Sequence, residues 1–250
     1  MRSYPTLGRG PDLIMLPGWG MSAVVWRDWA EALAGEWCVH LFELPGHAGD
    51  PAEDFDVATL RAQLIESAPA GAVWVGWSLG GMLSLQLAHE TAAAGMCLMA
   101  TSPRFCTGDG WSAGVDPAAL RAMQAGLEQG VERVWREFLG LLGSRGGTAR
   151  AEVKALRYRQ PTPAAGATGL QAGLRYLLTT DLRSMVARIE TPTRWLVGEL
   201  DPLISPAAVE GVASSMVAAK ATCLLGAGHV PFYSHRAELD AALAELRRML

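Results

Sequence analysis

The chain has 250 residues, of which 50% are hydrophobic and 18% are charged. This composition excludes an intrinsically disordered chain, which combines low hydrophobicity with high net charge, and the length is sufficient to bury a full core without disulfides. The net charge of −4 argues against a general polyanion binder, so we expect no nucleic-acid partner.

Short apolar runs alternate with amphipathic stretches along most of the chain. The predicted strands are Leu13–Leu16, Trp37–Leu44, Ala72–Trp77, Gly95–Thr101, Thr193–Val197 and Ala221–Leu225. The predicted helices among them are Val24–Ala34, Val57–Ser67, Leu79–Glu90, Pro206–Met216 and Arg236–Met249. This alternation is typical of an α/β protein with a mostly parallel central sheet flanked by helices.

The alternation stops between about Pro103 and Arg188, where the sequence predicts helices only. They are Ala118–Gly126, Val131–Leu142, Thr148–Tyr158 and Gly169–Leu178, separated by stretches rich in Gly and Pro. We therefore predict one domain over residues 1–250, with an inserted helical lid at about 103–188.

The charge also changes in this helical segment. Residues 111–183 contain ten Lys and Arg against six Asp and Glu, a net charge of +4, while the rest of the chain carries −8. A basic cap on an acidic body indicates an acidic partner or substrate at the cap. Ordinary solvated helix faces would explain the same count.

The compartment is predicted from the cysteines and from the apolar runs. Cys38, Cys97, Cys106 and Cys223 form no CxxC pair, and we interpret them as reduced thiols in the core of a cytoplasmic protein. The first residues lack the apolar segment of a signal peptide. No apolar run has the length of a membrane span, so we expect no membrane partner.

The candidate nucleophile is Ser78 in the stretch Gly76–Gly80, which fits the G-x-S-x-G pattern. The pattern is short, but here it lies between a predicted strand and a predicted helix. At such a turn the serine is held in a strained conformation, and side chains at positions 76 and 80 would clash. The helix that follows directs its N-terminus at the site, where negative charge develops.

A serine hydroxyl needs a base to act as a nucleophile. His229 is the candidate, because it follows the last predicted strand in a glycine loop that could return over the sheet. His47, in a loop after a strand, is an alternative base. The other three histidines are interpreted as structural or surface residues, namely His40, His89 and His235.

The acid that orients the histidine is predicted to be Asp201, which follows the predicted strand Thr193–Val197. The chain order Ser78, Asp201, His229 is the order found in α/β-hydrolases. Glu199 is the alternative acid, and a purely structural Asp201 that caps a turn is a further alternative.

Catalysis of acyl transfer also needs hydrogen-bond donors for the oxyanion. One candidate is the N–H of Leu79, directly after the nucleophile. The other is the N–H of Trp19, in the loop Pro17–Gly20 after the first predicted strand. A tight connection without a catalytic role is the alternative for this loop.

Taken together, these residues resemble the α/β-hydrolase family, and within it the biotin-pathway carboxylesterases that demethylate pimeloyl-[acyl-carrier protein] methyl ester. The resemblance covers nearly the whole chain. Its specific stretches are Pro17–Gly20 with Trp26, Leu44–Gly46, Gly76–Gly81, Thr101–Phe105, Thr180–Leu182, Asp201–Pro206 and Gly228–Phe232.

The resemblance implies roles for further residues. It assigns the lid segment Phe138–Leu142 to the pimeloyl chain, with substrate-binding residues Phe138, Leu139, Gly140, Leu141 and Leu142. It assigns Arg133, Arg150 and Lys154 to docking of the acidic carrier protein. Two positions depart from the family pattern: Glu137 stands in place of an arginine, and Pro17 stands where many members have histidine.

The predicted activity is ester hydrolysis through an acyl-enzyme, without a metal or organic cofactor, by a monomer that acts on a carrier-bound substrate. We expect a preference for short or medium acyl chains, with Trp19, Trp77, Phe138 and Leu142 as bulky walls of the pocket. The alternatives are a general short-chain carboxylesterase, a C–C bond hydrolase of the same fold, and a catalytically silent binding protein.

Overall fold

The computed structural model describes residues 4–47, 57–87 and 90–250. Within them, the centre is a sheet of six parallel strands in the order β2-β1-β3-β4-β5-β6. The strands are β1 (Asp12–Leu16), β2 (Cys38–Leu41), β3 (Val73–Trp77), β4 (Gly95–Met99), β5 (Thr193–Gly198) and β6 (Ala219–Leu224). Every connection between successive strands contains a helix, as parallel pairing requires. The prediction of a parallel sheet flanked by helices is confirmed.

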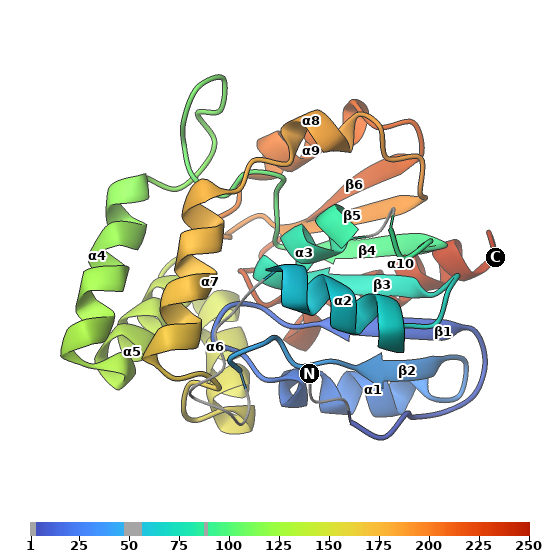
Figure 1. The fold of residues 1–250 in the computed structure, drawn as a ribbon, viewed down its shortest axis with the longest axis horizontal. Coiled ribbons are helices and arrows are strands. Elements are labelled where there is room, and N and C mark those ends of the chain that lie inside the picture. The colour runs from blue at the N-terminus through green and yellow to red at the C-terminus, as the bar shows by residue number, and fades with distance from the viewer. Residues whose placement is uncertain (1–3, 48–56, 88–89) are drawn as a thin grey trace.

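Helices cover both faces of this sheet (Figure 1). Helix α3 (Leu79–Leu87) packs on β3 and β4, and α10 (Arg236–Arg247) packs on β4 and β5 from the other face. The remaining helices outside the segment between β4 and β5 are η1 (Ala23–Trp26), α1 (Arg27–Leu33), α2 (Val57–Ser67), α9 (Pro206–Ser214) and η2 (Pro231–Tyr233). The two η elements are short 3-10 turns.

Predicted and observed elements differ mainly at their ends. The predicted helix Val24–Ala34 is divided into η1 and α1, and Ser22 caps η1 by accepting the Val24 N–H. Strand β2 ends at Leu41, before the predicted end Leu44, because its pairing with β1 ends at Met15 and Leu41. The predicted helix Leu79–Glu90 extends over residues 88 and 89, which lie outside the described part of the chain together with the His89 interpretation.

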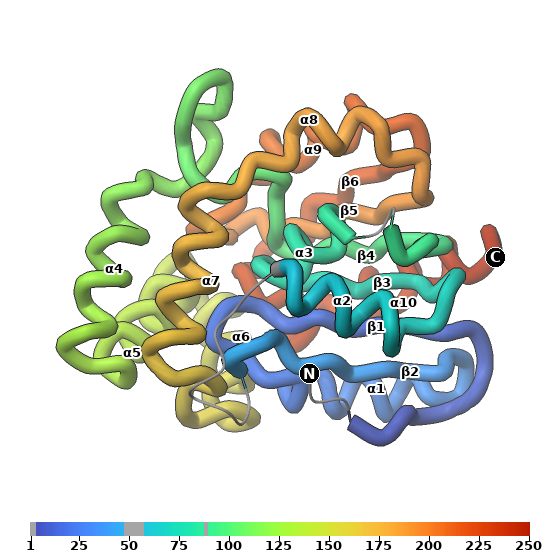
Figure 2. The backbone as a smooth tube through the Cα atoms, in the orientation of Figure 1, coloured from blue at the N-terminus to red at the C-terminus, as the bar shows by residue number. Residues whose placement is uncertain are grey.

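Five helices occupy the connection from β4 to β5. They are α4 (Pro117–Gln129), α5 (Val131–Leu142), α6 (Gly147–Arg159), α7 (Ala167–Thr179) and the short α8 (Arg183–Val186), of which only α8 was not predicted. Helices α4 to α7 lie beyond the carboxyl ends of the strands, and the backbone tube shows them as one group beside the sheet (Figure 2). Helix α4 packs on α5 and α7, and α5 packs on α6.

The two ends of this helical segment meet where it leaves the sheet. Arg104 donates to Asp181 at 2.8 Å, and the Leu182 N–H donates to the Pro103 carbonyl at 2.8 Å. Hydrogen bonds from Arg183 hold the pKa of Asp181 at about 2, with a smaller contribution from Arg104. The segment is therefore closed at its base by a backbone hydrogen bond and an ion pair.

The core is built on fully buried strands β3, β4 and β5 and on large aromatic side chains. Cys97 and Cys106 are buried thiols as predicted. Cys38 is only partly buried and Cys223 is exposed, so for Cys223 the core prediction is wrong. The reason is that β6 is the edge strand of the sheet, and near its end both Thr222 and Cys223 are exposed. Among the helices of the described residues, none combines the length and the apolar character needed to cross a membrane.

Candidate active site

Ser78 lies at the sharp turn between β3 and α3. Its φ angle is +54°, a left-handed conformation that non-glycine residues rarely adopt. An added Cβ at Gly80 would lie 2.4 Å from the Leu16 carbonyl oxygen, and one at Gly76 would lie 2.6 Å from the Cα of Gly81. The predicted strain at the serine and the predicted need for both glycines are therefore confirmed.

The backbone of Ser78 is fixed by hydrogen bonds from the neighbouring strand. Its N–H donates to the Met99 carbonyl at 2.9 Å, and its carbonyl accepts the Thr101 hydroxyl at 2.8 Å. The side chain is nearly buried but faces the cavity described below. The strained turn thus holds the Ser78 hydroxyl at the N-terminus of α3 and the carboxyl end of β3.

His229 and Asp201 form a fully buried pair. The Nδ1 atom of His229 lies 2.8 Å from Oδ2 of Asp201, and neither side chain is exposed. The second carboxylate oxygen of Asp201 accepts the N–H groups of Leu203 and Ile204 at 2.8 and 3.1 Å. Asp201 therefore both caps the turn before α9 and contacts the imidazole, so the structural interpretation and the contact with His229 occur together.

The other ring nitrogen of His229 is buried and has no hydrogen-bond partner among the described residues. Its ring packs against Trp77, whose indole N–H donates to the His229 carbonyl at 2.8 Å. Catalytic hydrogen bonds are often long without substrate and shorten when it binds. Nε2 is thus the ring atom with the capacity to take a proton.

The alternative acid and the alternative base lie in other environments. Glu199 is exposed and accepts the Gly226 N–H at 2.9 Å. His47 is buried, its Nδ1 faces the Pro45 carbonyl at 3.0 Å, and its Nε2 accepts the Gly20 N–H at 3.1 Å. Burial lowers the pKa of His47 to about 4, against a smaller opposing effect of the Pro45 carbonyl. Because both nitrogens are engaged, the structure gives His47 no lone pair for general-base chemistry.

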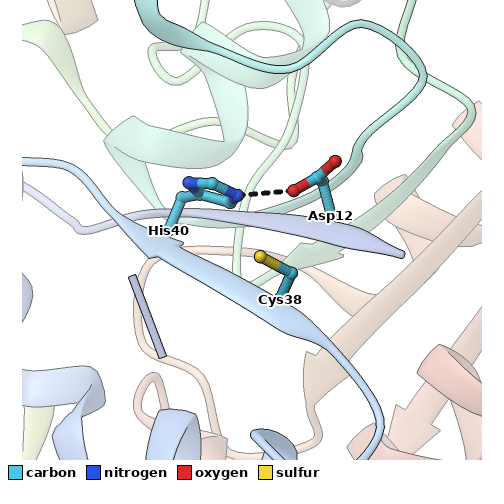
Figure 3. Close-up of side chains that lie close together, drawn as sticks. All are labelled: Asp12, Cys38 and His40. Atoms are coloured by element: carbon cyan, nitrogen blue, oxygen red, sulfur yellow. Dashed lines mark hydrogen bonds and ion pairs between the residues drawn. The ribbon is translucent and has the colours of Figure 1, made fainter. Parts of the chain in front are cut away.

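The other two histidines of the described part make local contacts. His40 Nε2 lies 2.6 Å from an Asp12 oxygen, close to Cys38, and this group is the one set of potential metal ligands among the described residues (Figure 3). His235 contacts Ser234 and the Leu225 carbonyl. Neither histidine lines the cavity at Ser78.

The loop after β1 carries the predicted oxyanion donor Trp19. Its ring is buried, and its indole N–H donates to the Leu170 carbonyl of α7 at 2.9 Å. Leu79 is the first residue of α3, so its amide N–H has no acceptor within the helix. Trp19 lines the same cavity as Ser78, and Leu79 follows Ser78 at the start of α3. The role of their backbone N–H groups as oxyanion donors stays a prediction.

Two residues that sequence reasoning did not assign hold the same loop. Gln160 accepts the Ser22 N–H and donates to the Gly20 carbonyl, both at 2.8 Å. Gly20 itself has φ +71°, and an added Cβ would lie 2.8 Å from the Trp135 ring. Together with His47, Gln160 fixes both polar groups of the Gly20 backbone. No local motif identifies Gln160, because its contacts lie 138 and 140 residues away.

A cavity between the sheet and helices α4, α5 and α7 opens on Ser78. Apart from Ser78, all of its wall residues are apolar: Trp19, Phe105, Val115, Ala119, Leu120, Met123, Phe138, Leu141, Leu174, Leu177 and Leu203. Phe138 contacts Trp19 edge-on, with ring centroids 5.1 Å apart. The site therefore offers an uncharged pocket directly beside the nucleophile.

The predicted pocket residues divide between this cavity and other places. Phe138 and Leu141 line it, whereas Leu139 and Gly140 border a groove between α5 and α6 and Leu142 is buried. The expectation that Trp77 and Leu142 form cavity walls is wrong. A helix directs neighbouring residues to different faces, so a continuous run such as Phe138–Leu142 does not line one pocket.

The basic residues predicted to dock a carrier protein also occupy two different surroundings. Arg150 and Lys154 of α6 line the groove against α5, together with Arg157. Arg133 of α5 instead donates to the Glu137 carboxylate at 3.0 Å, and half of its side chain remains buried. The structure therefore groups Arg150 and Lys154 with Arg157, and it pairs Arg133 with the acid that departs from the family pattern.

Comparison with known proteins agrees with this architecture. The model of the alpha/beta hydrolase family matches residues 13–242. A pimeloyl-[acyl-carrier protein] methyl ester esterase of Stenotrophomonas maltophilia is 35% identical over 246 residues, covering 94% of this chain and 92% of its own. An esterase of the same name from Chromobacterium violaceum is 36% identical, covering 96% and 95%.

The fold is also found among solved structures. An esterase from Exiguobacterium antarcticum superposes with a TM-score of 0.86 at 17% identity, over 98% of this chain and 95% of its own. At this identity the likeness concerns the fold alone.

Proposed function

Since this chain belongs to the alpha/beta hydrolase family, we propose that it is a serine carboxylesterase that removes the methyl group from pimeloyl-[acyl-carrier protein] methyl ester. The observation that carries this function is the cavity at Ser78, which is apolar throughout its remaining wall. The relatives named pimeloyl-[acyl-carrier protein] methyl ester esterase align with nearly the full chain. Ser78, His229 and Asp201 form the catalytic triad in this proposal.

Acylation begins when the Ser78 hydroxyl attacks the ester carbonyl and gives its proton to Nε2 of His229. The backbone N–H groups of Trp19 and Leu79 donate to the oxyanion that forms. The tetrahedral intermediate collapses, its carbonyl re-forms, and the C–OCH₃ bond breaks. His229 gives its proton to the departing oxygen, so methanol leaves and the acyl group stays on Ser78.

Deacylation repeats these steps with water as the nucleophile. His229 takes a proton from the water as it attacks the acyl-enzyme, and then returns the proton to Ser78 Oγ as the acid is released. Asp201 holds Nδ1–H of the imidazole at 2.8 Å, which fixes the tautomer that leaves Nε2 free to accept.

The apolar wall favours the methyl ester over the free acid. A methyl ester and a methylene chain lose little on leaving water, whereas a carboxylate without a partner is costly to bury. None of the wall residues of this cavity in the described chain is charged. The substrate is therefore bound with its methylated end inside, and the ionised product is expelled from the pocket.

The carrier protein docks on the lid in this proposal. Arg150, Lys154 and Arg157 form a basic groove between α5 and α6, and an acidic carrier would be steered to it. Arg133 contributes less, because Glu137 already pairs with it. The lid is the inserted segment of about 103–188, and the enzyme works as a cytoplasmic monomer.

A general short-chain carboxylesterase is the second candidate, because the same cavity would accept small neutral esters without any carrier. The two candidate functions differ in the role of the basic groove, because only a carrier-bound substrate would contact it. A silent binding protein is a third possibility, and it would not react with a fluorophosphonate at Ser78.

Growth rescue tests the proposal. A biotin-requiring strain that lacks its pimeloyl-carrier methyl ester esterase is expected to grow without biotin when it expresses this chain. The Ser78→Ala variant, expressed to the same soluble level, is the matched control and leaves the strain dependent on biotin. Continued dependence with the unaltered chain would favour the general esterase.

A further inference from the structure

A buried carboxylate of the lid contacts the loop that carries His229. Glu152 lies in α6 and is 1% exposed. Its two oxygens each lie 3.1 Å from the Gly228 amide nitrogen, and one of them accepts the Val230 N–H at 3.2 Å. The hydroxyl of Ser234 donates to the same carboxylate. Both neighbours of His229 are thus bonded to one side chain.

The packing around this contact leaves little freedom. An added Cβ at Gly228 would lie 2.7 Å from a Glu152 oxygen and 2.8 Å from the Cβ of Ala149. The Gly228 carbonyl also packs against the end of β5, where a Cβ at Gly198 would lie 2.2 Å from its oxygen. The loop is therefore held between β5 and the lid helix α6.

The position of Glu152 on its helix is unusual for an acid. Its helical neighbours on the buried face are Ala149, Val153 and Leu156, so an ionisable side chain interrupts an apolar stripe. A buried charge is retained only where hydrogen bonds compensate its desolvation. Here the donors are two backbone N–H groups and a hydroxyl, and all of them belong to the segment after β6.

We propose that Glu152 is a positioning residue for the catalytic histidine. Through Glu152, the position of His229 depends on helix α6 being packed against the loop of residues 228–230. Glu152 contacts no reacting atom, and it acts by fixing the backbone on both sides of His229. A misplacement of about 1 Å at a catalytic group costs roughly 100-fold in rate. This inference rests on the proposed function, because it takes His229 as the base.

The test compares Glu152→Gln with Glu128→Gln, a matched control that makes the same change at an exposed residue of α4, outside the cavity and the basic groove. A glutamine keeps the shape but brings an NH₂ donor against the N–H groups of Gly228 and Val230. We expect Glu152→Gln to lower kcat for a small p-nitrophenyl ester about 10- to 100-fold, with KM changed less than about threefold. Glu128→Gln is expected to leave both constants within about twofold.

Turnover is expressed per active site, counted by fluorophosphonate labelling of Ser78 to completion. A merely structural role would lower the number of labelled sites and leave kcat per site unchanged, and that result would overturn the proposal. Ser234→Ala, which removes one donor and leaves both backbone donors, gives a second measurement in case Glu152→Gln does not fold. It is expected to lower kcat per site by about two- to fivefold, and an unchanged value would contradict the proposal.

The same experiment separates the two ideas. If the unaltered chain neither hydrolyses the ester nor labels at Ser78, the proposed function fails. If the unaltered chain hydrolyses the ester and labels at Ser78, and Glu152→Gln has the same kcat per labelled site, only the role of Glu152 fails.

A second, independent group of side chains lies at the start of the sheet. Asp12 begins β1 and pairs in register with Cys38, which begins β2. His40 is two residues further along β2, so all three side chains project from the same face (Figure 3). Each contributes one ligand atom, and these atoms lie within 4.8 Å of one another. The active-site loops leave the opposite, carboxyl ends of the strands.

The geometry points to a binding site for Zn²⁺ at Asp12, Cys38 and His40. A thiolate, an imidazole and a carboxylate are the donors that zinc prefers, and a water would complete a tetrahedron. The side chains of His40 and Asp12 are 17% and 35% exposed, so an ion can enter from solvent. Ligand bonds of about 2.0–2.3 Å require the Asp12–His40 contact to open slightly. The bound ion would clamp the outer strand β2 to β1.

Titration with Zn²⁺ alone, in competition with a chromophoric chelator, tests this site. One equivalent is expected to bind, and Cys38→Ser and His40→Gln are each expected to weaken binding at least tenfold. Cys223→Ser, which removes the exposed thiol of β6, is the control and leaves binding unchanged. Co²⁺ is expected to give a thiolate charge-transfer band that Cys38→Ser abolishes. Equal binding by the unaltered chain and Cys38→Ser, or no binding, would overturn the assignment.

Discussion

The amide N–H of Gly20 donates to Nε2 of His47 at 3.1 Å, and this bond links the loop after β2 to the loop that carries Trp19. It requires the neutral imidazole, because a protonated ring would place an N–H against the N–H of Gly20. The consequence is a dependence of stability on pH that can be measured.

Burial lowers the pKa of His47 to about 4 in the folded protein from 6.5, so the unfolded chain binds this proton first as the pH falls. The contribution of neutral His47 to stability is complete above about pH 6.5 and is lost as the pH falls towards 4. Between pH 7 and pH 5 the loss amounts to about 2 kcal/mol.

Denaturant unfolding of the unaltered chain and of His47→Gln at both pH values measures this contribution. Glutamine can still accept the Gly20 N–H but does not titrate. The unaltered chain is expected to lose about 2 kcal/mol more than the variant. An equal loss in the two proteins would show that His47 is not held neutral.

The two acids near the end of β5 are expected to differ sharply. Asp201→Asn removes the anion that orients His229, and kcat should fall by about 10⁴-fold. Glu199→Gln alters an exposed residue that accepts one backbone N–H, so its kcat should stay within about threefold. Steady-state kinetics with a small ester compares the two variants, and the reverse order of effects would assign the acid to Glu199.

The cavity is expected to select short and medium acyl chains. Trp19 and Phe138 form its bulky wall, and a chain too long for the space would hold the lid helices away from the sheet. A series of p-nitrophenyl esters from acetyl to palmitoyl should show kcat/KM that peaks early and falls with the long chains. Leu141→Ala, which shortens a wall residue, should move the peak to longer chains, whereas Ile65→Ala on the exposed face of α2 should not. Preference for long-chain triglycerides would contradict this account of the pocket.

The basic groove is expected to affect the carrier-bound substrate alone. Replacing Arg150 and Lys154 together with Glu reverses the field at the groove and should raise KM for the carrier ester at least tenfold at low salt. The chemistry lies at Ser78, so kinetics with a small free ester should be nearly unchanged. Arg136→Glu, which reverses an exposed charge of α5 outside the groove, is the control and should leave KM for the carrier ester nearly unchanged.

Salt provides a second criterion for the groove. The difference between the reversed variant and the unaltered chain should shrink from roughly 20 mM to roughly 200 mM salt, because screening weakens attraction between exposed charges. Equal, small effects on both substrates at both salt concentrations would show an ordinary solvated helix face.

Local signals were sufficient to predict the positions of Ser78, Asp201 and His229. The serine lies in a short pattern at a strand–helix junction, and the other two follow strands whose carboxyl ends meet at one edge of a parallel sheet. The roles of the three as a triad stay a prediction until activity is measured.

Contacts between distant segments escaped prediction. Gln160 holds Gly20 across 140 residues, and Glu152 holds Gly228 across 76. Their only signal in the sequence is indirect, as with Glu152, which interrupts the apolar stripe of α6. Which side of a lid helix faces the cavity was also not predictable, and so Leu142 was placed in a wall that it does not form.

The most direct test of the account is hydrolysis of purified pimeloyl-carrier methyl ester, measured as methanol released by the unaltered chain and by Ser78→Ala. The unaltered chain is expected to release one methanol per ester over many turnovers, with Ser78→Ala slower by several orders of magnitude at an unchanged unfolding temperature. Release by the folded Ser78→Ala variant within about tenfold of the unaltered rate, or no release by the unaltered chain, would contradict it.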